Sequence, residues 1–499
     1  MAIIKTSRKL HKWLMLFVGV QFLIWAATGL YMVAMNIDYI HGDSLVTNKH
    51  HIIDAKQVQF TLADLQQQFA DAEQINLTML QGKAVYQFKQ GKKWRLVAAQ
   101  TGELLTHITK AQAVSIAKSR YAGTETGTEK IFSSMLITEP NGEISPRILP
   151  AWQVNFDDVG APRLYISAQT GELVTKRHDF WVLFDWMFRF HIMDYGEDED
   201  SSNSLLLVIA LISLLACIAG VVLTYVSFIK VAGKSIKPPK TNKNRIKNKK
   251  LKAMPWIRFL HRWFSLLVFV QLLIWISTGL YFNLMDHQKA SGNQHRQRIV
   301  AETKQFANEA LFPLTKVLQQ YPLLEKISLL NRLGEPYYLL TFQQGLYSHF
   351  PRQQTLIDAK TGEVKRFDAE AIEQIALLSY KGNALINASQ KIRQIEELPK
   401  QQNPLWQVNL NDKLNTSVYI DVQNASVIAH VDDDKRLADL MFKLHFMDYR
   451  ILNNLLGSKT GGFNNAQVIL LALLTLLFAL TGVYWLLHLV KHKQFKIKA

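Results

Sequence analysis

Four long apolar stretches constrain this 499-residue chain more than any other feature of its sequence. Each is about 20 or more residues long, which is the length that an α-helix needs to cross the hydrocarbon core of a bilayer. The sequence therefore predicts four membrane spans, near Trp13 to Met35, Leu205 to Ile229, Phe259 to Leu284 and Val468 to Leu489. The segments between them are too polar for further spans, and we assign them to soluble domains and tails.

The positive charges lie beside the ends of these spans and predict the orientation of the chain. Twelve Lys or Arg residues and no acidic residue occur between Lys230 and Arg262, and further lysines precede the first span and follow the fourth. Short loops rich in Lys and Arg stay in the cytoplasm, so both termini and the middle loop are predicted there. No nucleic-acid-binding motif accompanies the net charge of +17, which indicates contact with membrane lipid and not with nucleic acid.

The resulting domain plan alternates short membrane segments with two large domains on the far side of the membrane. The predicted order is a cytoplasmic N-terminus and first span (1–36), an outer domain with an interfacial segment (37–203), the second span (204–229), a basic cytoplasmic loop (230–257), the third span (258–284), a second outer domain with an interfacial segment (285–465), the fourth span (466–490) and a cytoplasmic tail (491–499).

The two halves of the chain repeat one another. From His11 to Asn36, 14 of 26 positions are identical to those 250 residues later. At an offset of 254, "DWMFRFHIMDYG" from Asp185 matches "DLMFKLHFMDYR" from Asp439, and "AWQVNF" matches "LWQVNL". Both copies start in the cytoplasm, so we predict two parallel repeats about a pseudo-twofold axis along the membrane normal.

Each outer domain reads as a helix followed by short alternating strands, twice over. Three Thr-Gly-Glu tripeptides, starting at Thr101, Thr170 and Thr361, follow such strands, where Gly supplies the positive φ of a tight turn. At the fourth place the chain reads "DVQNASVIA", so we interpret that turn as having diverged. The predicted fold class is a four-span helical bundle with two α+β outer domains, built from one α+β unit used four times.

Only four of the fifteen histidines recur in both halves: His11 with His261, and His191 with His445. The first pair lies at the cytoplasmic ends of spans and the second on the outer side, about 30 Å away, so one centre cannot join them. The axis instead predicts two bis-histidine sites, each suited to a six-coordinate b-type haem. Zinc would need about four donors, which the cytoplasmic level lacks. The single cysteine, Cys217, excludes an intrachain disulfide and a c-type haem attachment.

Several residues near these histidines are candidates for a supporting role, each with an ordinary structural alternative. The helix face of His11 also carries Trp25 and Gly29, and that of His261 carries Trp275 and Gly279. The alternative to a supporting role is ordinary helix packing through small residues. Asp194 and Asp448 either close a turn, which we favour, or orient the imidazoles. Gln21 and Gln271 are interpreted as fastening helices to one another, with cofactor contact as the alternative.

The motifs "LHKWL...TGLY", the strand-Thr-Gly-Glu turns, and "FRFHIMDY" or "FKLHFMDY" before the next span together resemble the PepSY-associated transmembrane proteins. That family includes inner-membrane siderophore-iron reductases of the ferrioxamine type, which hold two b-type haems on histidines of the bundle. The resemblance implies a bacterial inner-membrane protein with periplasmic outer domains, electron transfer to a ferric siderophore, and haem ligation by His11, His191, His261 and His445.

Other interpretations remain open from the sequence. The outer domains could instead be membrane-anchored PepSY binding modules that sense or inhibit a periplasmic peptidase or ligand, without redox activity. A permease has less support because the spans lack interrupted helices and a charged interior. No flavin or nicotinamide motif is present, so the electron donor would be a quinol or a cytoplasmic reductase. A role for His488 in ligation is also left open.

Overall fold

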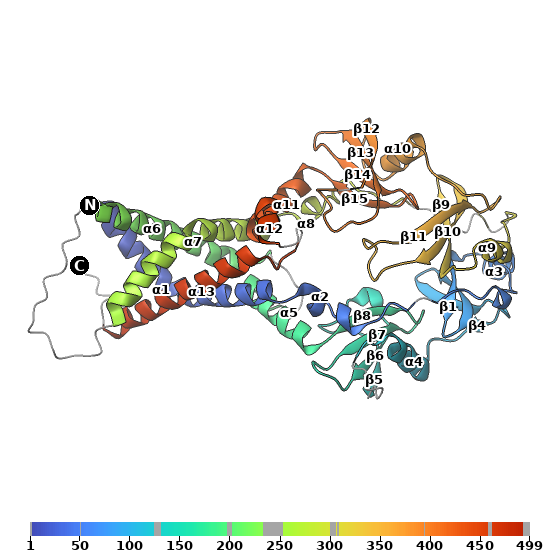
Figure 1. Cartoon of the computed structure of the whole chain (residues 1–499), viewed down its shortest axis with the longest axis horizontal. Coiled ribbons are helices and arrows are strands. Elements are labelled where there is room, and N and C mark those ends of the chain that lie inside the picture. Colours follow the sequence, from blue (N-terminus) through green and yellow to red (C-terminus); the bar gives the residue numbers. More distant parts are fainter. Residues whose placement is uncertain are drawn as a thin grey trace, which may run out of the picture. The chain divides into compact units, whose positions relative to one another are not determined.

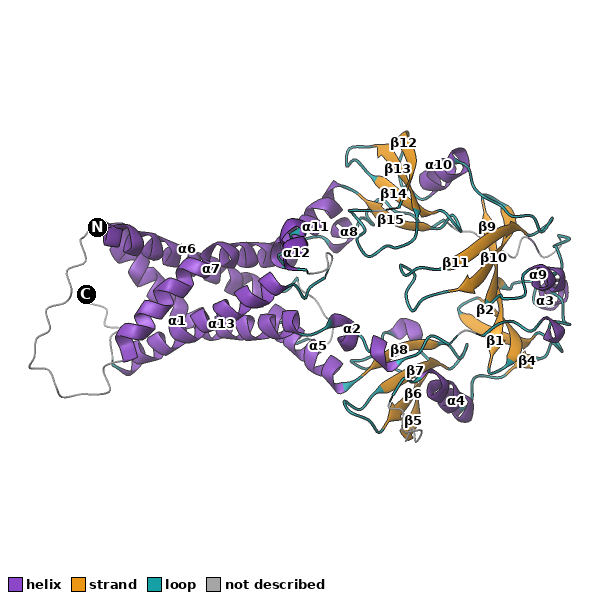
Figure 2. Cartoon of the chain, in the orientation of Figure 1, coloured by secondary structure: helices purple, strands orange, loops and turns teal. Residues whose placement is uncertain are grey.

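A computed structural model describes the chain apart from a few short segments and one longer one. The described residues are 2–49, 51–123, 131–196, 202–232, 253–299, 306, 309–393, 395–457 and 462–492, so most of the predicted basic loop and the end of the tail lie outside them. The chain divides into two compact units, one helical (1–40, 183–286 and 438–499) and one built around β-sheets (41–182 and 287–437). Figures 1 and 2 show the long helices in one unit, and the strands with several short helices in the other.

The helical unit contains the four predicted spans. Among the described residues, four helices are long and apolar enough to cross a membrane: α1 (Ala2–Ala34), α6 (Ser204–Ala232), α7 (Ala253–Leu284) and α13 (Ala466–Lys491). α1 packs against α6 and α13, and α7 packs against the same two helices. The four spans therefore form a closed bundle in which each half of the chain supplies two helices, and this confirms a multi-pass membrane protein.

Several small residues are buried in the interior of this bundle, and some large apolar residues face outward. Ala26, Ala210 and Ala479 are buried between the helices, whereas Phe17 is 73% exposed. In water such an exposed aromatic ring would favour aggregation, but in lipid it is in its preferred solvent. Small side chains let helix backbones approach closely where no hydrophobic driving force holds helices together.

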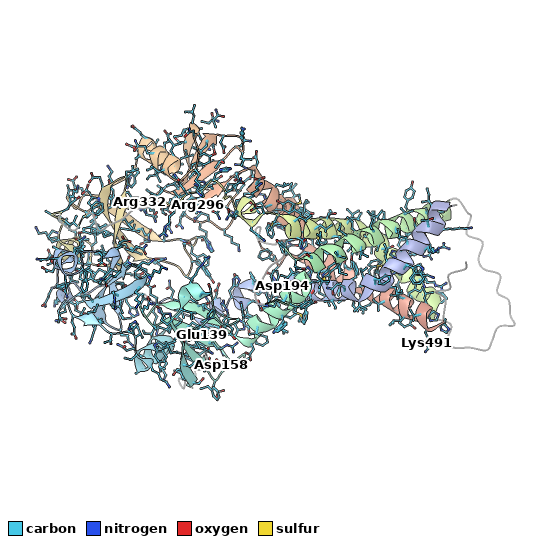
Figure 3. The ribbon with its side chains drawn as sticks, turned by 180° about the vertical axis from the view of Figure 1, so that it is seen from behind. Glu139, Asp158, Asp194, Arg296, Arg332 and Lys491 are labelled. Carbon is cyan, nitrogen blue, oxygen red and sulfur yellow. The ribbon has the colours of Figure 1, made fainter. Side chains whose placement is uncertain are left out.

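Shorter helices adjoin the spans. α5 (Asp179–Ile192) and α11 (Asp433–His445) end in the two repeated His-x-Met-Asp-Tyr sequences, and α12 (Arg450–Leu456) follows α11. The four-residue helices α2 (Ile37–Ile40) and α8 (His287–Ala290) follow α1 and α7. Figure 3 places Asp194, just after α5, and Lys491, the last residue of α13, at opposite ends of the helical unit.

The sheet unit contains four α+β modules, as the sequence predicts. The first half of the chain supplies α3 (Leu62–Gln68) with β1 (Glu73–Leu80), β2 (Lys83–Gln90), β3 (Lys93–Ala98) and β4 (Leu104–Leu105), then α4 (Lys110–Arg120) with β5 (Ile131–Ile137), β6 (Ala151–Phe156), β7 (Arg163–Ser167) and β8 (Leu173–Arg177). The second half supplies α9 (Leu314–Gln320) with β9 (Lys326–Arg332), β10 (Glu335–Gln343) and β11 (Gln353–Asp358), then α10 (Ala369–Leu378) with β12 (Leu385–Ile392), β13 (Leu405–Asn411), β14 (Ser417–Asp421) and β15 (Val427–Val431).

Two of these modules are fused into one sheet, which the sequence did not predict. β1 pairs antiparallel with β9, with Leu77 opposite Ile327, and this pairing joins the halves in a seven-stranded sheet of order β11-β10-β9-β1-β2-β3-β4. α3 and α9 lie on the same face of it, where Leu65 and Val317 share one buried core (Figure 1). The other two modules keep separate four-stranded sheets, β5-β6-β7-β8 and β12-β13-β14-β15. The joined sheet leaves neither β1 nor β9 as an exposed edge.

The four strand-ending turns share one backbone, although one of them lacks the Thr-Gly-Glu sequence. Gly102, Gly171 and Gly362 have φ of 76°, 73° and 80°, and their amides donate to the carbonyl four residues earlier. Ala425 occupies the fourth place with φ 54° and donates in the same way to Asp421. This turn has therefore diverged in sequence, as we interpreted, but it keeps the backbone conformation of the other three. Ala425 is held in a left-handed conformation that suits glycine.

This strain predicts that Ala425→Gly stabilises the protein. An L-residue in the left-handed region costs roughly 1–2 kcal/mol, and the greater freedom of glycine in the unfolded chain cancels part of that gain. We expect a higher thermal unfolding midpoint for the purified protein. Gly171→Ala is the matched control and should lower the midpoint, because φ is 73° there and the added methyl group would lie 2.7 Å from Leu80. Equal effects of the two substitutions on the unfolding midpoint would contradict the conclusion that Ala425 is strained.

Candidate functional site

A cavity of about 820 Å³ lies inside the helical unit, between α1, α6, α7 and α13. The α1 wall consists of Arg8, His11, Lys12, Met15, Val18, Gly19 and Phe22. The α7 wall consists of Arg258, His261, Arg262, Ser265, Val268, Phe269 and Leu272. Every residue of the first wall has its counterpart 250 positions later in the second, and each set follows the spacing of three and four residues that makes one face of a helix.

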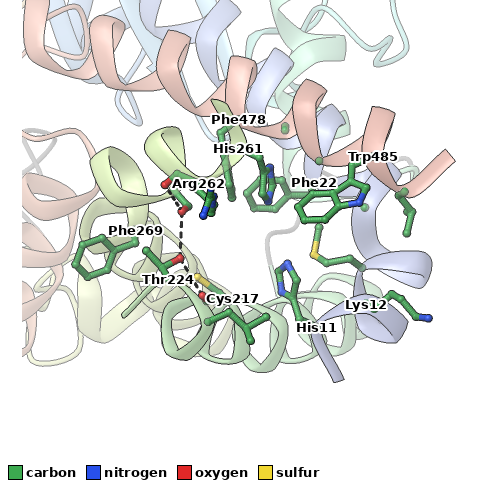
Figure 4. Close-up of a pocket in the computed structure, with 18 of the residues that line it drawn as sticks. His11, Lys12, Phe22, Cys217, Thr224, His261, Arg262, Phe269, Phe478 and Trp485 are labelled. Carbon is green, nitrogen blue, oxygen red and sulfur yellow. Dashed lines mark hydrogen bonds between the residues drawn. The ribbon is translucent and has the colours of Figure 1, made fainter. Parts of the chain in front are cut away.

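The structure brings His11 and His261 to this one cavity, as the sequence predicted (Figure 4). Nδ1 of His11 donates a hydrogen bond to the carbonyl of Ala216 on α6 at 2.8 Å. Nδ1 of His261 lies 3.1 Å from the hydroxyl of Thr481 on α13, and that hydroxyl donates its own proton to Phe478. His261 must therefore donate from Nδ1. In both rings the hydrogen bond fixes the tautomer that carries its lone pair on Nε2, as found in metal-bound histidines.

Two glycines allow these rings to lie against the opposite helices, and our sequence analysis missed both. A methyl group on Gly220 would lie 3.1 Å from Cε1 of His11, and one on Gly482 would lie 3.1 Å from Cε1 of His261. Such contacts are tighter than most real side-chain contacts, so each ring would have to shift by a few tenths of an ångström. The sequence contains a pattern that could have identified them. The second and fourth spans both carry "LL" followed by "GV" at an offset of 262, which aligns Gly220 with Gly482.

His191 and His445 are held in a matching way against the far halves of α1 and α7. Nδ1 of His191 lies 3.1 Å from the hydroxyl of Thr28, which donates to the carbonyl of Ile24 at 2.8 Å. Nδ1 of His445 lies 2.8 Å from the hydroxyl of Thr278, which donates to Ile274. Thr28 and Thr278 are counterparts in the repeat. All four repeated histidines thus bind a neighbouring helix through Nδ1, and the described residues provide no hydrogen-bond partner for Nε2 of any of them.

Burial keeps the second pair of imidazoles neutral. His191 and His445 lie outside the four membrane-spanning helices, and burial lowers the pKa of His191 to about 4. Burial also lowers the pKa of His445 to about 3, and His191 makes a smaller contribution to the same shift. The neutral ring is the form that can ligate a metal.

Three of the four predicted supporting residues on α1 and α7 lie near the outer histidines and not near the inner ones. Gly29 faces His191, since its added methyl group would lie 3.3 Å from the ring, and Trp275 donates to the carbonyl of His445 at 2.6 Å. Trp25 packs beside Ile192. Gly279, by contrast, has open space beside it. Gly29 and Trp275 therefore contact the outer histidines, and Trp25 packs near one of them, although all three share a helix face with the inner histidines.

The two mid-span glutamines differ from one another. Gln271 on α7 donates to the carbonyl of Leu444 on α11 at 3.0 Å, so it fastens two helices as predicted. For Gln21 that interpretation is not supported, because its buried Nε2 has no hydrogen-bond partner among the described residues. Glutamine is therefore present at this position in both halves of the chain, but the hydrogen bond of Gln271 has no equivalent among the described residues at Gln21.

Asp194 and Asp448 lie in the turns that end α5 and α11. The preceding methionines, Met193 and Met447, have φ of 55° and 51°. The amides of the two aspartates donate to carbonyls five residues earlier, which is the Schellman pattern of a helix end. The ring of His488 lies beside that of His492, with ring centres 4.3 Å apart and planes tilted by 49°, and His488 is not among the residues that line the cavity.

The chemistry of the cavity suits an apolar group that carries negative charge. Its walls are mainly apolar, four of its lining residues are cationic, and none of the described lining residues is acidic. Two buried polar atoms on the walls, Oγ of Ser213 and Nε1 of Trp485, have no hydrogen-bond partner among the described residues. In the described part of the chain, no group of three or more His, Cys, Asp or Glu is placed to hold a metal ion.

The fold and this cavity define a multi-pass membrane protein with α+β domains attached to its helices. The chain belongs to the family of the PepSY-associated TM region, whose model matches residues 8–488. This match confirms the family resemblance noted in the sequence. No match to a curated protein was found.

Gly29 and Gly279 offer a matched test of how the outer histidines are seated. Gly29→Ala should displace His191 and lower the thermal unfolding midpoint, because the methyl group would lie 3.3 Å from the ring. Gly279→Ala meets open space and should be neutral or stabilising by up to about 1 kcal/mol, since alanine favours helix more than glycine does. The measurement is thermal unfolding of both purified variants. A midpoint for Gly29→Ala equal to that of Gly279→Ala would show that His191 is not packed on α1 as described.

Proposed function

We propose that this protein is an inner-membrane electron-transfer protein that carries electrons outward through two b-type haems and reduces a ferric siderophore. His11 and His261 would hold one haem near the cytoplasmic side, and His191 and His445 the other near the periplasmic side. The two halves of the bundle would be related by a pseudo-twofold axis along the membrane normal, which brings each histidine to its counterpart.

One observation carries the proposal: four histidines, paired by the repeat, all hydrogen-bond through Nδ1 and leave Nε2 available. Histidines that serve only to join helices would have no reason to share this orientation at four positions. Six-coordinate haem needs two such nitrogens, one on each face of an apolar ring. The cavity between His11 and His261 adds the apolar walls and cationic residues that such a group requires.

The spacing of the histidines along the helices supports two separate centres. Thr28, which holds His191, lies 17 residues after His11 on α1, and Thr278 lies 17 residues after His261 on α7. At 1.5 Å per residue the two levels are about 26 Å apart along the helix axis. When bound, the haems would supply one-electron redox chemistry at two depths, and the protein's part is to orient the imidazoles and exclude water around them.

The substrate is proposed from the direction of transfer and from one-electron chemistry. The positive charges at the ends of the spans favour a periplasmic location for the sheet unit. A ferric siderophore there would accept one electron, and the resulting ferrous ion would be released because the hard oxygen ligands of a siderophore bind it less tightly. Electrons would enter from a membrane quinol or a cytoplasmic reductase.

The decisive experiment measures haem content and spectrum in full-length protein after haem-replete expression. We expect two reducible b-type haems per chain with a low-spin bis-histidine spectrum. His11→Ala or His261→Ala should remove one haem, and His191→Ala or His445→Ala the other, with loss of ferric-siderophore reduction in each case. His488→Ala is the matched control, since it removes a histidine of α13 that does not line the cavity.

Two results would contradict this function. Wild-type protein without reducible haem would exclude electron transfer through these sites. Histidine variants that fold normally and keep their activity would instead favour the binding-module interpretation, in which the sheet unit recognises a periplasmic peptidase or ligand and the spans serve as anchors.

A further inference from the structure

The cationic residues of the cavity occupy matched positions in the two halves. Arg8 and Arg258 are counterparts, as are Lys12 and Arg262, and all four line the cavity beside His11 and His261. Arg8 and Arg258 stand three residues before the histidines, which is about 4.5 Å along the helix axis. Each histidine therefore has a guanidinium one turn closer to the start of its helix and on the same face.

Topology signals alone do not account for this arrangement. The positive-inside preference requires Lys and Arg at the cytoplasmic ends of spans, but it is indifferent to the helix face on which they lie. Lys5 and Lys9 satisfy it on α1 without lining the cavity. A bound anion in the cavity would be attracted by all four cationic side chains, and none of the described lining residues is acidic.

The α7 and α13 side of the cavity carries an additional donor. The buried Nε1 of Trp485 has no hydrogen-bond partner among the described residues. The guanidinium of Arg258 lies over the ring of the same tryptophan, 5.3 Å from its centre, and this contact limits the positions that Arg258 can adopt. The ring of His261 is 5.7 Å from that of Trp485 (Figure 4). In the repeat, Trp485 corresponds to Leu223, so α6 has no indole N–H at this level of the cavity. The unpartnered hydroxyl of Ser213 on α6 lies ten residues before Leu223, about 15 Å away along the helix.

We propose that these residues bind the two carboxylates of the haem held by His11 and His261, with Arg258, Arg262 and Trp485 forming the stronger carboxylate site and Arg8 and Lys12 the weaker one. This inference rests on the proposed function. Haem b is apolar except for two propionate groups on one edge. Guanidinium groups pair with carboxylates through two parallel hydrogen bonds, and an indole N–H can donate a third. The difference between the two carboxylate sites would then determine the orientation in which the haem is bound.

The test compares haem with its dimethyl ester, in which both carboxylates are blocked. Full-length apoprotein from haem-deficient expression is titrated with each compound, and binding is followed by the low-spin spectrum. Arg258→Gln and Trp485→Phe should weaken haem binding relative to ester binding. For Arg258→Gln we expect roughly ten- to a hundredfold, as for the loss of a hydrogen bond to a charged group. Arg8→Gln should have a smaller effect, and Lys9→Gln, which removes an equal charge outside the cavity, none.

A second readout follows the reduction potential of the bound haem. A nearby positive charge favours the ferrous state, so Arg258→Gln should lower the midpoint potential and Lys9→Gln should leave it unchanged. Trp485→Phe keeps the ring beneath Arg258 and so separates the N–H donor from packing. If every variant binds haem and ester in the wild-type ratio, the carboxylate site is wrong and the proposed function stands. If wild-type apoprotein binds neither compound, the proposed function itself fails.

Discussion

The structure of the helical unit depends on one interaction that occurs four times: an imidazole Nδ1 bonded to a helix of the bundle. The acceptor is a backbone carbonyl for His11 and a threonine hydroxyl for His191, His261 and His445. Each hydrogen bond fixes a tautomer and a ring orientation, and the glycines Gly29, Gly220 and Gly482 provide the space for a ring against a helix. In lipid, where an unpaired polar group is costly, such bonds also specify which helices are neighbours.

Much of the helical unit could be predicted from sequence because its determinants are local. Apolar length predicts a span, and a repeat at a fixed offset pairs His11 with His261 without any knowledge of the fold. The contacts of Gln21 could not be predicted in this way. Gln271, at the same repeat position, bonds a neighbouring helix, whereas Nε2 of Gln21 has no hydrogen-bond partner in the part of the chain that the structure describes. The roles of Gly220 and Gly482 required the packing of α6 and α13 to be known.

The sheet unit was predictable module by module and not as an assembly. Alternating strands and turn residues indicate each α+β unit, but β1 and β9 pair across about 250 residues, and no local pattern marks two strand edges as partners. The backbone conformation of the turn at Ala425 could not be predicted, for a different reason. Sequence suggested a lost motif, whereas the surrounding strands β14 and β15 impose the left-handed conformation on a residue that does not favour it.

The strand pairing between β1 and β9 makes the two halves of the chain one body in the sheet unit, and this has a consequence for assembly kinetics. Each half is continuous with two of the four spans. Once the sheet has formed, the helices of one half meet those of the other at an effective concentration set by a short tether instead of by diffusion along the membrane. A ligand that needs one side chain from each half would then find its second partner already nearby, and it would be retained even when one of the two bonds opens for a moment.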